Sequence, residues 1–151
     1  MTVVINGLDE LRDRAGQHLG YSGWLEITQD RINLFADATD DHQWIHVDVE
    51  RAKSGPFGGP IAHGFLTLSL LIPLWTELLE LRGIAMAVNY GLNKVRFPAP
   101  VPAGSRIRLG AALASVTDVQ GGVEAIVDSV IERDGSEKPV CVAQVVHRYY
   151  A

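Results

Sequence analysis

The second half of the chain alternates apolar and polar residues in a way that predicts a sheet. In residues 106–116 the apolar side chains fall on one face and two arginines on the other, and residues 123–133 set apolar side chains against acidic ones. A period of two is the pattern of a strand with one buried face. Residues 87–97 and 140–150 are predicted to be strands as well, and turn-like sequences separate the segments. We therefore predict four antiparallel strands.

A long apolar segment precedes these strands and is predicted to be a helix over about residues 61–81. It is apolar almost all round, so it needs cover on every face. A bilayer-spanning helix needs about 20 apolar residues, and this segment contains His63, Gly64 and Pro73. We therefore predict a helix buried in a globular fold and no membrane span. A curved sheet wrapped around it would bury it, which predicts an α+β fold in one domain, residues 1–151.

Shorter elements are predicted before the apolar segment. Residues 8–16 are predicted to form a short helix and residues 20–28 an extended segment. Thr28 is a plausible N-cap for a second helix over residues 29–39, whose apolar residues form a stripe. The acidic pair Asp40–Asp41 is expected to end that helix.

Composition limits the class of protein. The 151 residues are 47% hydrophobic and 21% charged, which suits one globular domain. The formal net charge is −5, so a nucleic-acid surface is not expected, because phosphate binding needs clustered Lys and Arg. The one local basic group could contact phosphates or lie at solvated strand ends; its members are Lys94, Arg96, Arg106 and Arg108.

The only cysteine, Cys141, lies in a predicted buried strand, so an inert packing role is expected and an internal disulfide is impossible. The first residues lack a basic start followed by an apolar run, so no signal peptide is predicted and a cytoplasmic location is expected.

The run FADATDDHQWIH, residues 35–46, carries the candidate chemistry. It places two proton carriers, Asp41 and His46, five residues apart in a predicted loop that is followed by one helical turn at residues 48–52. A glycine-flanked helix start at Gly64 would add backbone N–H donors close by. An acid/base pair beside such donors suits chemistry on a thioester. Taken alone, Asp41 could be a turn residue and His46 a packed histidine.

A metal site is not expected. His42 and His46 have a spacing that could bind zinc on a helix, but no glutamate lies between them and the segment is predicted to be loop. No phosphate-binding loop or serine-nucleophile motif is present either.

Three ordered motifs resemble those of the MaoC-like hydratases, the (R)-specific enoyl-CoA hydratases of the hot-dog fold. They are F-A-D-A-T-D-D-H-Q-W-I-H-V-D, F-G-G-P-I-A-H-G-F-L-T and F-P-A-P-V-P-A-G-S. The resemblance covers about residues 20–150. The chain departs from the family pattern at Gln43 and Trp44, where Asn and Pro are usual.

The resemblance implies roles for particular residues. Asp41 and His46 take the places of the catalytic aspartate and histidine, Asp48 that of a trailing acid, and Gly64 that of the oxyanion donor. The candidate substrate contacts are His63, Phe65 and Arg96, and for His63 a structural role is an equal alternative.

The resemblance also implies a substrate and an assembly. The expected substrate is an acyl thioester of coenzyme A or acyl carrier protein, with no cofactor. Because one sheet wrapped around a helix leaves an open edge, a homodimer is expected. Two other functions stay open: a hot-dog thioesterase, and a non-catalytic subunit that binds acyl thioesters.

Overall fold

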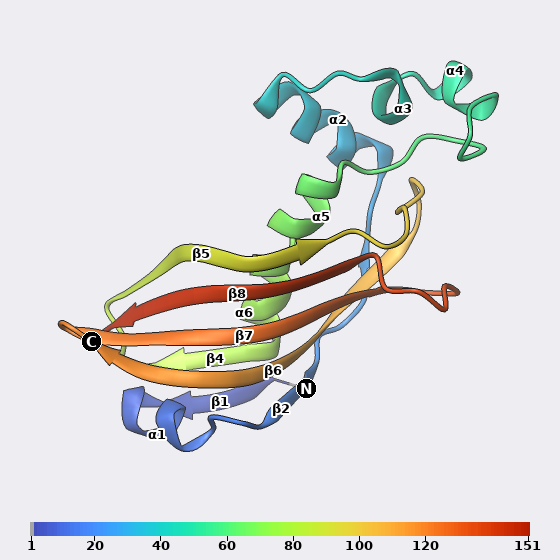
Figure 1. The fold of residues 1–151 in the computed structure, drawn as a ribbon. Helices are drawn as coiled ribbons and strands as arrows, with labels where there is room; N and C mark the ends of the chain where they lie inside the picture. The colour runs from blue at the N-terminus through green and yellow to red at the C-terminus, as the bar shows by residue number, and fades with distance from the viewer. Residues whose placement is uncertain (1) are drawn as a thin grey trace.

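A curved antiparallel sheet forms the main layer of the computed structural model, which describes residues 2–151 (Figure 1). The sheet has the strand order β2-β6-β7-β8-β5, and the short strand β3 also pairs with β6. The strands are β2 (His18–Tyr21), β3 (Leu25–Glu26), β5 (Met86–Arg96), β6 (Arg106–Val119), β7 (Gly122–Arg133) and β8 (Cys141–Tyr150). The four predicted strands are confirmed, and β6 runs a few residues further than predicted.

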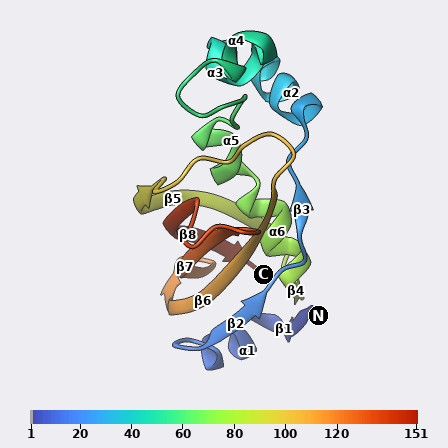
Figure 2. The ribbon, with the colours of Figure 1, turned by 90° about the vertical axis from the view of Figure 1, so that its right-hand side faces the viewer.

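The predicted alternation in the long strands is also confirmed. The apolar residues of β6 and β7 that share the inner face are fully buried: Ile107, Leu109, Ala111, Leu113, Val123, Ala125, Val127 and Ile131. Each large aliphatic side chain buried in this way contributes roughly 1.5–3 kcal/mol to folding. The core therefore lies between this face and the apolar helical segment, α5 and α6, that crosses it (Figure 2).

The prediction of one helix over residues 61–81 is wrong. The segment holds α5 (Gly64–Ser69) and α6 (Leu71–Leu78), separated at Leu70. Pro73 accounts for the break, because it has no N–H to donate to the carbonyl of Ser69. Helix formation then stops at Leu78, and the chain continues as strand β4.

Strand β4 (Leu79–Arg82) pairs in parallel with β1 (Val3–Asn6) and forms a second, two-stranded sheet. This pairing was not predicted, because local periodicity does not show a partner 76 residues away.

Full enclosure of the helical segment was also predicted, and it is only partly achieved. Leu71, Leu74 and Leu78 are buried against the sheet. Phe65, by contrast, is 70% exposed, and Leu68 and Ile72 are half-buried. One apolar stripe of the segment thus remains open next to β5.

The N-terminal region matches its prediction in outline. Helix α1 (Gly7–Asp13) ends earlier than predicted. Helix α2 (Gln29–Thr39) begins as predicted, since the Thr28 hydroxyl accepts a hydrogen bond from the Arg31 N–H at 3.1 Å. It ends at Asp40, whose backbone is left-handed with φ of 57°.

The region predicted as a loop contains two short helices, so that prediction is wrong for residues 44–47. They are α3 (Trp44–Val47) and α4 (Val49–Lys53). The Asp48 carboxylate accepts a hydrogen bond from the Arg51 N–H at 3.1 Å and so caps α4. Helices α2, α3 and α4 gather beyond the N-terminal end of α5, which brings the two candidate motifs together (Figure 2).

Cys141 is fully buried, and burial raises the pKa of its thiol to about 11. An inert packing role follows. Within residues 2–151 no helix has the length and apolar character needed to cross a membrane.

His147 on β8 should make the fold sensitive to acid. Burial lowers its pKa from 6.5 to about 4. Between these two values the unfolded imidazole binds a proton and the folded one does not, so the free energy of unfolding falls as the pH drops from 6.5 to 4. We expect His147→Leu to flatten this dependence by up to about 3 kcal/mol, as measured by urea unfolding at several pH values. An unchanged slope would contradict a buried neutral His147.

Candidate active site

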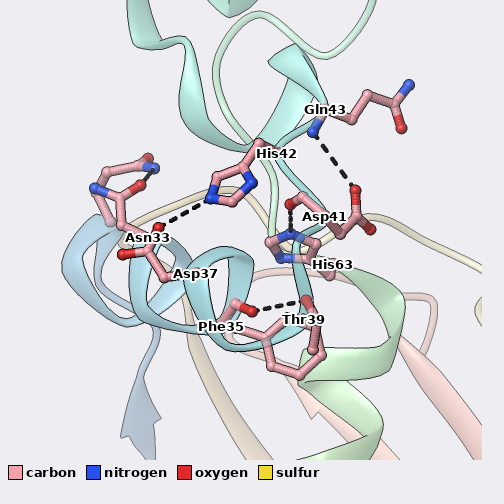
Figure 3. A network of polar contacts seen from close by, with 9 residues as sticks. Asn33, Phe35, Asp37, Thr39, Asp41, His42, Gln43 and His63 are labelled. Carbon is pink, nitrogen blue, oxygen red and sulfur yellow. Dashed lines mark hydrogen bonds and ion pairs between the residues drawn. The ribbon is translucent and has the colours of Figure 1, made fainter.

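Asp41, His46 and His63 converge although they come from different segments. Asp41 follows α2, His46 lies in α3, and His63 immediately precedes α5. One ring nitrogen of each histidine and one carboxylate oxygen of Asp41 all lie within 4.8 Å of one another. A hydrogen bond from the His63 side chain to the Asp41 backbone joins the residues after α2 to the start of α5 (Figure 3).

The His46 ring is held in one tautomer. Its Nδ1 lies 2.7 Å from the carbonyl oxygen of Ile61, and because a carbonyl can only accept, Nδ1 carries the proton. Nε2 is therefore left with a free lone pair. His46 is buried, and this desolvation lowers its pKa below 6.5, so the ring is neutral near pH 7. Gln29 Nε2 donates to the His46 carbonyl at 2.8 Å and ties α3 to α2.

His63 supports both other members of the cluster. Its Nε2 donates to the backbone carbonyl of Asp41 at 2.9 Å, which fixes the loop that carries this carboxylate. Its ring stacks on that of His46 with centroids 3.9 Å apart and an interplanar angle of 22°. The ring of Phe35 packs against the His63 ring, with the two ring centroids 4.9 Å apart. His63 is buried, and its Nδ1 has no hydrogen-bond partner in the described part of the chain.

The Asp41 carboxylate lies at the exposed side of the cluster. His42, its neighbour, turns away and pairs with Asp37 on α2 at 2.9 Å (Figure 3). The two histidines of the H-x-x-x-H sequence therefore do not face a common point. In residues 2–151 the one group of three or more side chains placed to hold a metal ion is Asp41, His46 and His63.

These residues line a cavity of about 270 Å³ together with Gly64, Phe65 and Phe97. Gly64 is the first residue of α5, so its N–H has no acceptor within the helix. A Cβ at this position would lie 3.2 Å from the ring of Phe97, which is tighter than ordinary contact. Because Gly64 has no side chain, its backbone and the Phe97 ring can lie side by side in the cavity wall.

The structure brings five of the six predicted site residues to one cavity. Arg96 is the exception: it is exposed, it does not line the cavity, and its Nη1 donates to the Val95 carbonyl at 2.7 Å. Its neighbour Phe97 lines the cavity instead. Phe97 was not predicted as a site residue, although it begins the motif F-P-A-P-V-P-A-G-S, which was the available signal.

Other predicted polar residues have structural contacts. Arg106 pairs with Asp134, and Arg108 pairs with Glu132 at 2.9 Å, so two members of the predicted basic group are neutralised.

The geometry supports acid/base chemistry on a water molecule. A neutral imidazole with one free nitrogen and a carboxylate lie beside the same cavity, and both can accept protons. The N–H of Gly64 adds a fixed donor for a developing negative charge.

Comparison with known proteins places the chain in context. A family model described as MaoC like domain matches residues 10–134. A protein of Mycobacterium tuberculosis named 3-hydroxyacyl-thioester dehydratase Z is 55% identical over 143 residues, covering 94% of this chain and 95% of that protein. The solved (R)-hydratase from A. caviae is 21% identical with a TM-score of 0.72, covering 88% of this chain and 94% of that one. A solved complex from Mycobacterium tuberculosis is described as a 3R-hydroxyacyl-ACP dehydratase. One of its chains matches with a TM-score of 0.70 at 18% identity, and the match covers 90% of this chain and 97% of the matched chain.

Proposed function

The chain belongs to the MaoC-like domain family, a family of hydratases and dehydratases with the hot-dog fold, and from this premise we propose its reaction. The proposed reaction is the (R)-specific hydration of a trans-2-enoyl thioester to an (R)-3-hydroxyacyl thioester, together with the reverse dehydration. The acyl group is carried by coenzyme A or acyl carrier protein. The relative named 3-hydroxyacyl-thioester dehydratase Z supports this substrate class.

In the proposed mechanism Asp41 and His46 share one water. As the water oxygen bonds to C3 of the enoyl group, one of the two residues accepts a proton from the water. The pair then passes that same proton to C2, so the elements of water add across the double bond and both residues return to their starting protonation states. Negative charge develops on the thioester oxygen during this step, and the Gly64 N–H stabilises it. His63 positions both partners, through the Asp41 backbone and through the stacked His46 ring.

One observation carries the proposal: a buried imidazole with one free ring nitrogen lies with a carboxylate on the cavity that Gly64 also lines. A thioesterase would instead need water aimed at the thioester carbonyl carbon. A non-catalytic subunit would have no need for an intact acid/base pair.

An assay with two readouts tests the proposal. We expect the ultraviolet absorbance of a trans-2-enoyl-CoA to fall without release of free thiol. Thiol release in step with the loss of substrate would indicate a thioesterase, and no change in either signal would indicate a binding subunit.

The pH dependence of kcat/KM should reflect the desolvated His46. Its ring must be neutral to accept a proton, and its pKa is lowered by burial. We therefore expect the acid limb of kcat/KM to lie below pH 6.5, the ordinary histidine value. A limb at or above pH 6.5 in an initial-rate profile would contradict the assignment.

We also propose a homodimer formed through β5. This strand pairs with β8 on one side, and the sheet ends at its other side. Exposed apolar side chains gather on and near it, namely Phe65, Met86, Tyr90, Leu92 and Phe97. An open strand edge beside exposed apolar groups favours pairing with a second chain. The related dehydratase described as a complex adds support for pairing of two chains in this family.

A further inference from the structure

We propose that an apolar trough next to the start of α5 binds the pantetheine arm that carries the acyl group, whether the arm belongs to coenzyme A or to acyl carrier protein. This inference rests on the proposed hydratase function and adds to it the orientation of the thioester. The trough has a volume of about 260 Å³. It is distinct from the catalytic cavity, but the two meet at Gly64 and Phe97, which line both.

Two segments of the chain form the walls of the trough. One leads into α5 and includes Phe57, and the other follows β5 and contributes residues 97–101. A hydrogen bond holds the segments together, since the Ala62 N–H donates to the Val101 carbonyl at 2.8 Å. Both segments lie beside α5 in Figure 2. The trough is therefore built directly onto the helix start that supplies the Gly64 N–H.

Prolines stiffen one of these walls. Pro98 and Pro100 both line the trough. Each proline has a fixed φ and disfavours a helical backbone at the residue before it. A wall that is already ordered loses little conformational entropy when a ligand binds. The trough is thus suited to holding a flexible, extended arm.

The chemistry of the trough matches an uncharged ligand. Among the described residues, those that line it carry no charged side chain, and most are apolar. The phosphates of a carrier therefore have no partner inside the trough. The pantetheine arm is uncharged: its methylene and methyl groups can cover apolar walls, and its amides keep hydrogen bonds to water on the open side. These properties select the arm over the phosphate-bearing end of the carrier.

The proposed reaction fixes which end of the thioester faces the trough. C2 and C3 of the enoyl group must lie at Asp41 and His46, and the thioester oxygen must lie at the Gly64 N–H. Asp41 and His46 line the catalytic cavity but not the trough, whereas Gly64 lines both. The sulfur is the remaining substituent of the carbonyl carbon, so it lies on the trough side of Gly64. The arm continues from the sulfur past the ring of Phe97, and the acyl tail, which begins at C3, leaves the site in another direction.

A series of carriers tests this assignment. The crotonyl group is presented on N-acetylcysteamine, which reproduces only the first part of the arm, on pantetheine and on coenzyme A. Wild type is compared with Phe57→Ala, because Phe57 lines the trough, is 45% exposed and does not line the catalytic cavity. We expect the variant to lower kcat/KM for crotonyl-pantetheine by about fivefold to twentyfold, through KM with kcat little changed, because it removes an apolar contact that ground and transition states share. The loss should be smaller for crotonyl-N-acetylcysteamine and the same for crotonyl-CoA.

The length of the acyl group is the second variable. With pantetheine as the carrier, Phe57→Ala should lower kcat/KM by the same factor for crotonyl, hexenoyl and octenoyl groups. A factor that grows with acyl length would place the acyl tail in the trough. A factor that is equal for all three carriers would show that the arm does not lie there. Either result would overturn the proposal.

Two further variants serve as controls. Leu34→Ala is the matched control, because Leu34 is an exposed apolar residue of α2 that lines neither the trough nor the catalytic cavity. It should leave every rate unchanged, and a loss equal to that of Phe57→Ala would contradict a specific role for Phe57. Phe57→Leu keeps an apolar side chain and should retain most of the wild-type kcat/KM for crotonyl-pantetheine.

The same data separate this inference from the proposed function. If the wild type hydrates all three crotonyl thioesters and Phe57→Ala equals it on each, the arm site is wrong and the hydratase function stands. If the wild type hydrates none of them, the hydratase function itself fails. Comparison of crotonyl-CoA with a crotonyl-loaded acyl carrier protein identifies the source of the arm. Phe57→Ala should lower kcat/KM for the carrier that the wild type prefers, and an unchanged value on that carrier would overturn the arm site.

Discussion

Replacing Asp41 by Asn or His46 by Gln should lower kcat/KM for hydration by about 10² to 10⁴. Each substitution keeps the approximate shape of the side chain and removes a proton acceptor. Asp41 is exposed, so its replacement should leave the fold intact. For His46 the glutamine can still approach the Ile61 carbonyl, which His46 now contacts at 2.7 Å. The measurement is the initial rate of loss of enoyl absorbance.

The double variant gives a sharper result than either single one. If both residues act on one water, removing the second should cost little once the first is gone, because groups that act as a unit are not additive. His42→Gln is the matched control: His42 lies in the same segment, but it pairs with Asp37. A single variant with near-normal turnover, or a control that loses activity equally, would contradict the assignment.

Replacing Leu92 by Lys should convert the proposed dimer to a monomer and remove most of the activity. Leu92 is 45% exposed on the edge strand β5 and lines an apolar groove beside α5. A lysine there adds a charge to each copy at the proposed interface, where burial of an unpaired charge is costly. Size-exclusion chromatography with light scattering gives the mass, and the absorbance assay gives the activity.

Val130→Lys is the control for this second prediction. Val130 is 37% exposed on β7, an interior strand of the same sheet. It should leave both mass and rate unchanged, since it lies away from the β5 edge. A wild-type protein that is monomeric and fully active would show that the interface was wrongly inferred.

The parts of the fold that were predictable from sequence are those fixed by local pattern. Period-two alternation located β6 and β7, and the Thr28 cap and the Asp40–Asp41 pair located both ends of α2. The helical segment was misjudged because its apolar character masked one local signal, Pro73, and because no local pattern shows the strand pairing of Leu79–Arg82. Pro73 breaks it, and Leu79–Arg82 favours a strand because β1 provides a partner from far along the chain.

In the candidate site, too, local motifs identified residues, whereas the contacts between those residues depend on distant parts of the chain. The motifs pointed to Asp41, His46 and Gly64 but not to how they meet. The tautomer of His46 depends on the Ile61 carbonyl, and the stacking of His63 on His46 depends on the approach of α5 to α3. Neither contact has a local sequence signature. Phe97 lies in one of the recognised motifs, but its contact with Gly64 depends on the packing of the segment after β5.

The most direct test of the central claim is to identify the product formed from trans-2-enoyl-CoA. Chiral chromatography with mass detection should find (R)-3-hydroxyacyl-CoA, one water heavier than the substrate, formed by the wild type and nearly absent with the Asp41→Asn, His46→Gln double variant. Formation of the free acid, of the (S) product, or of equal product by the double variant would contradict hydration by this pair.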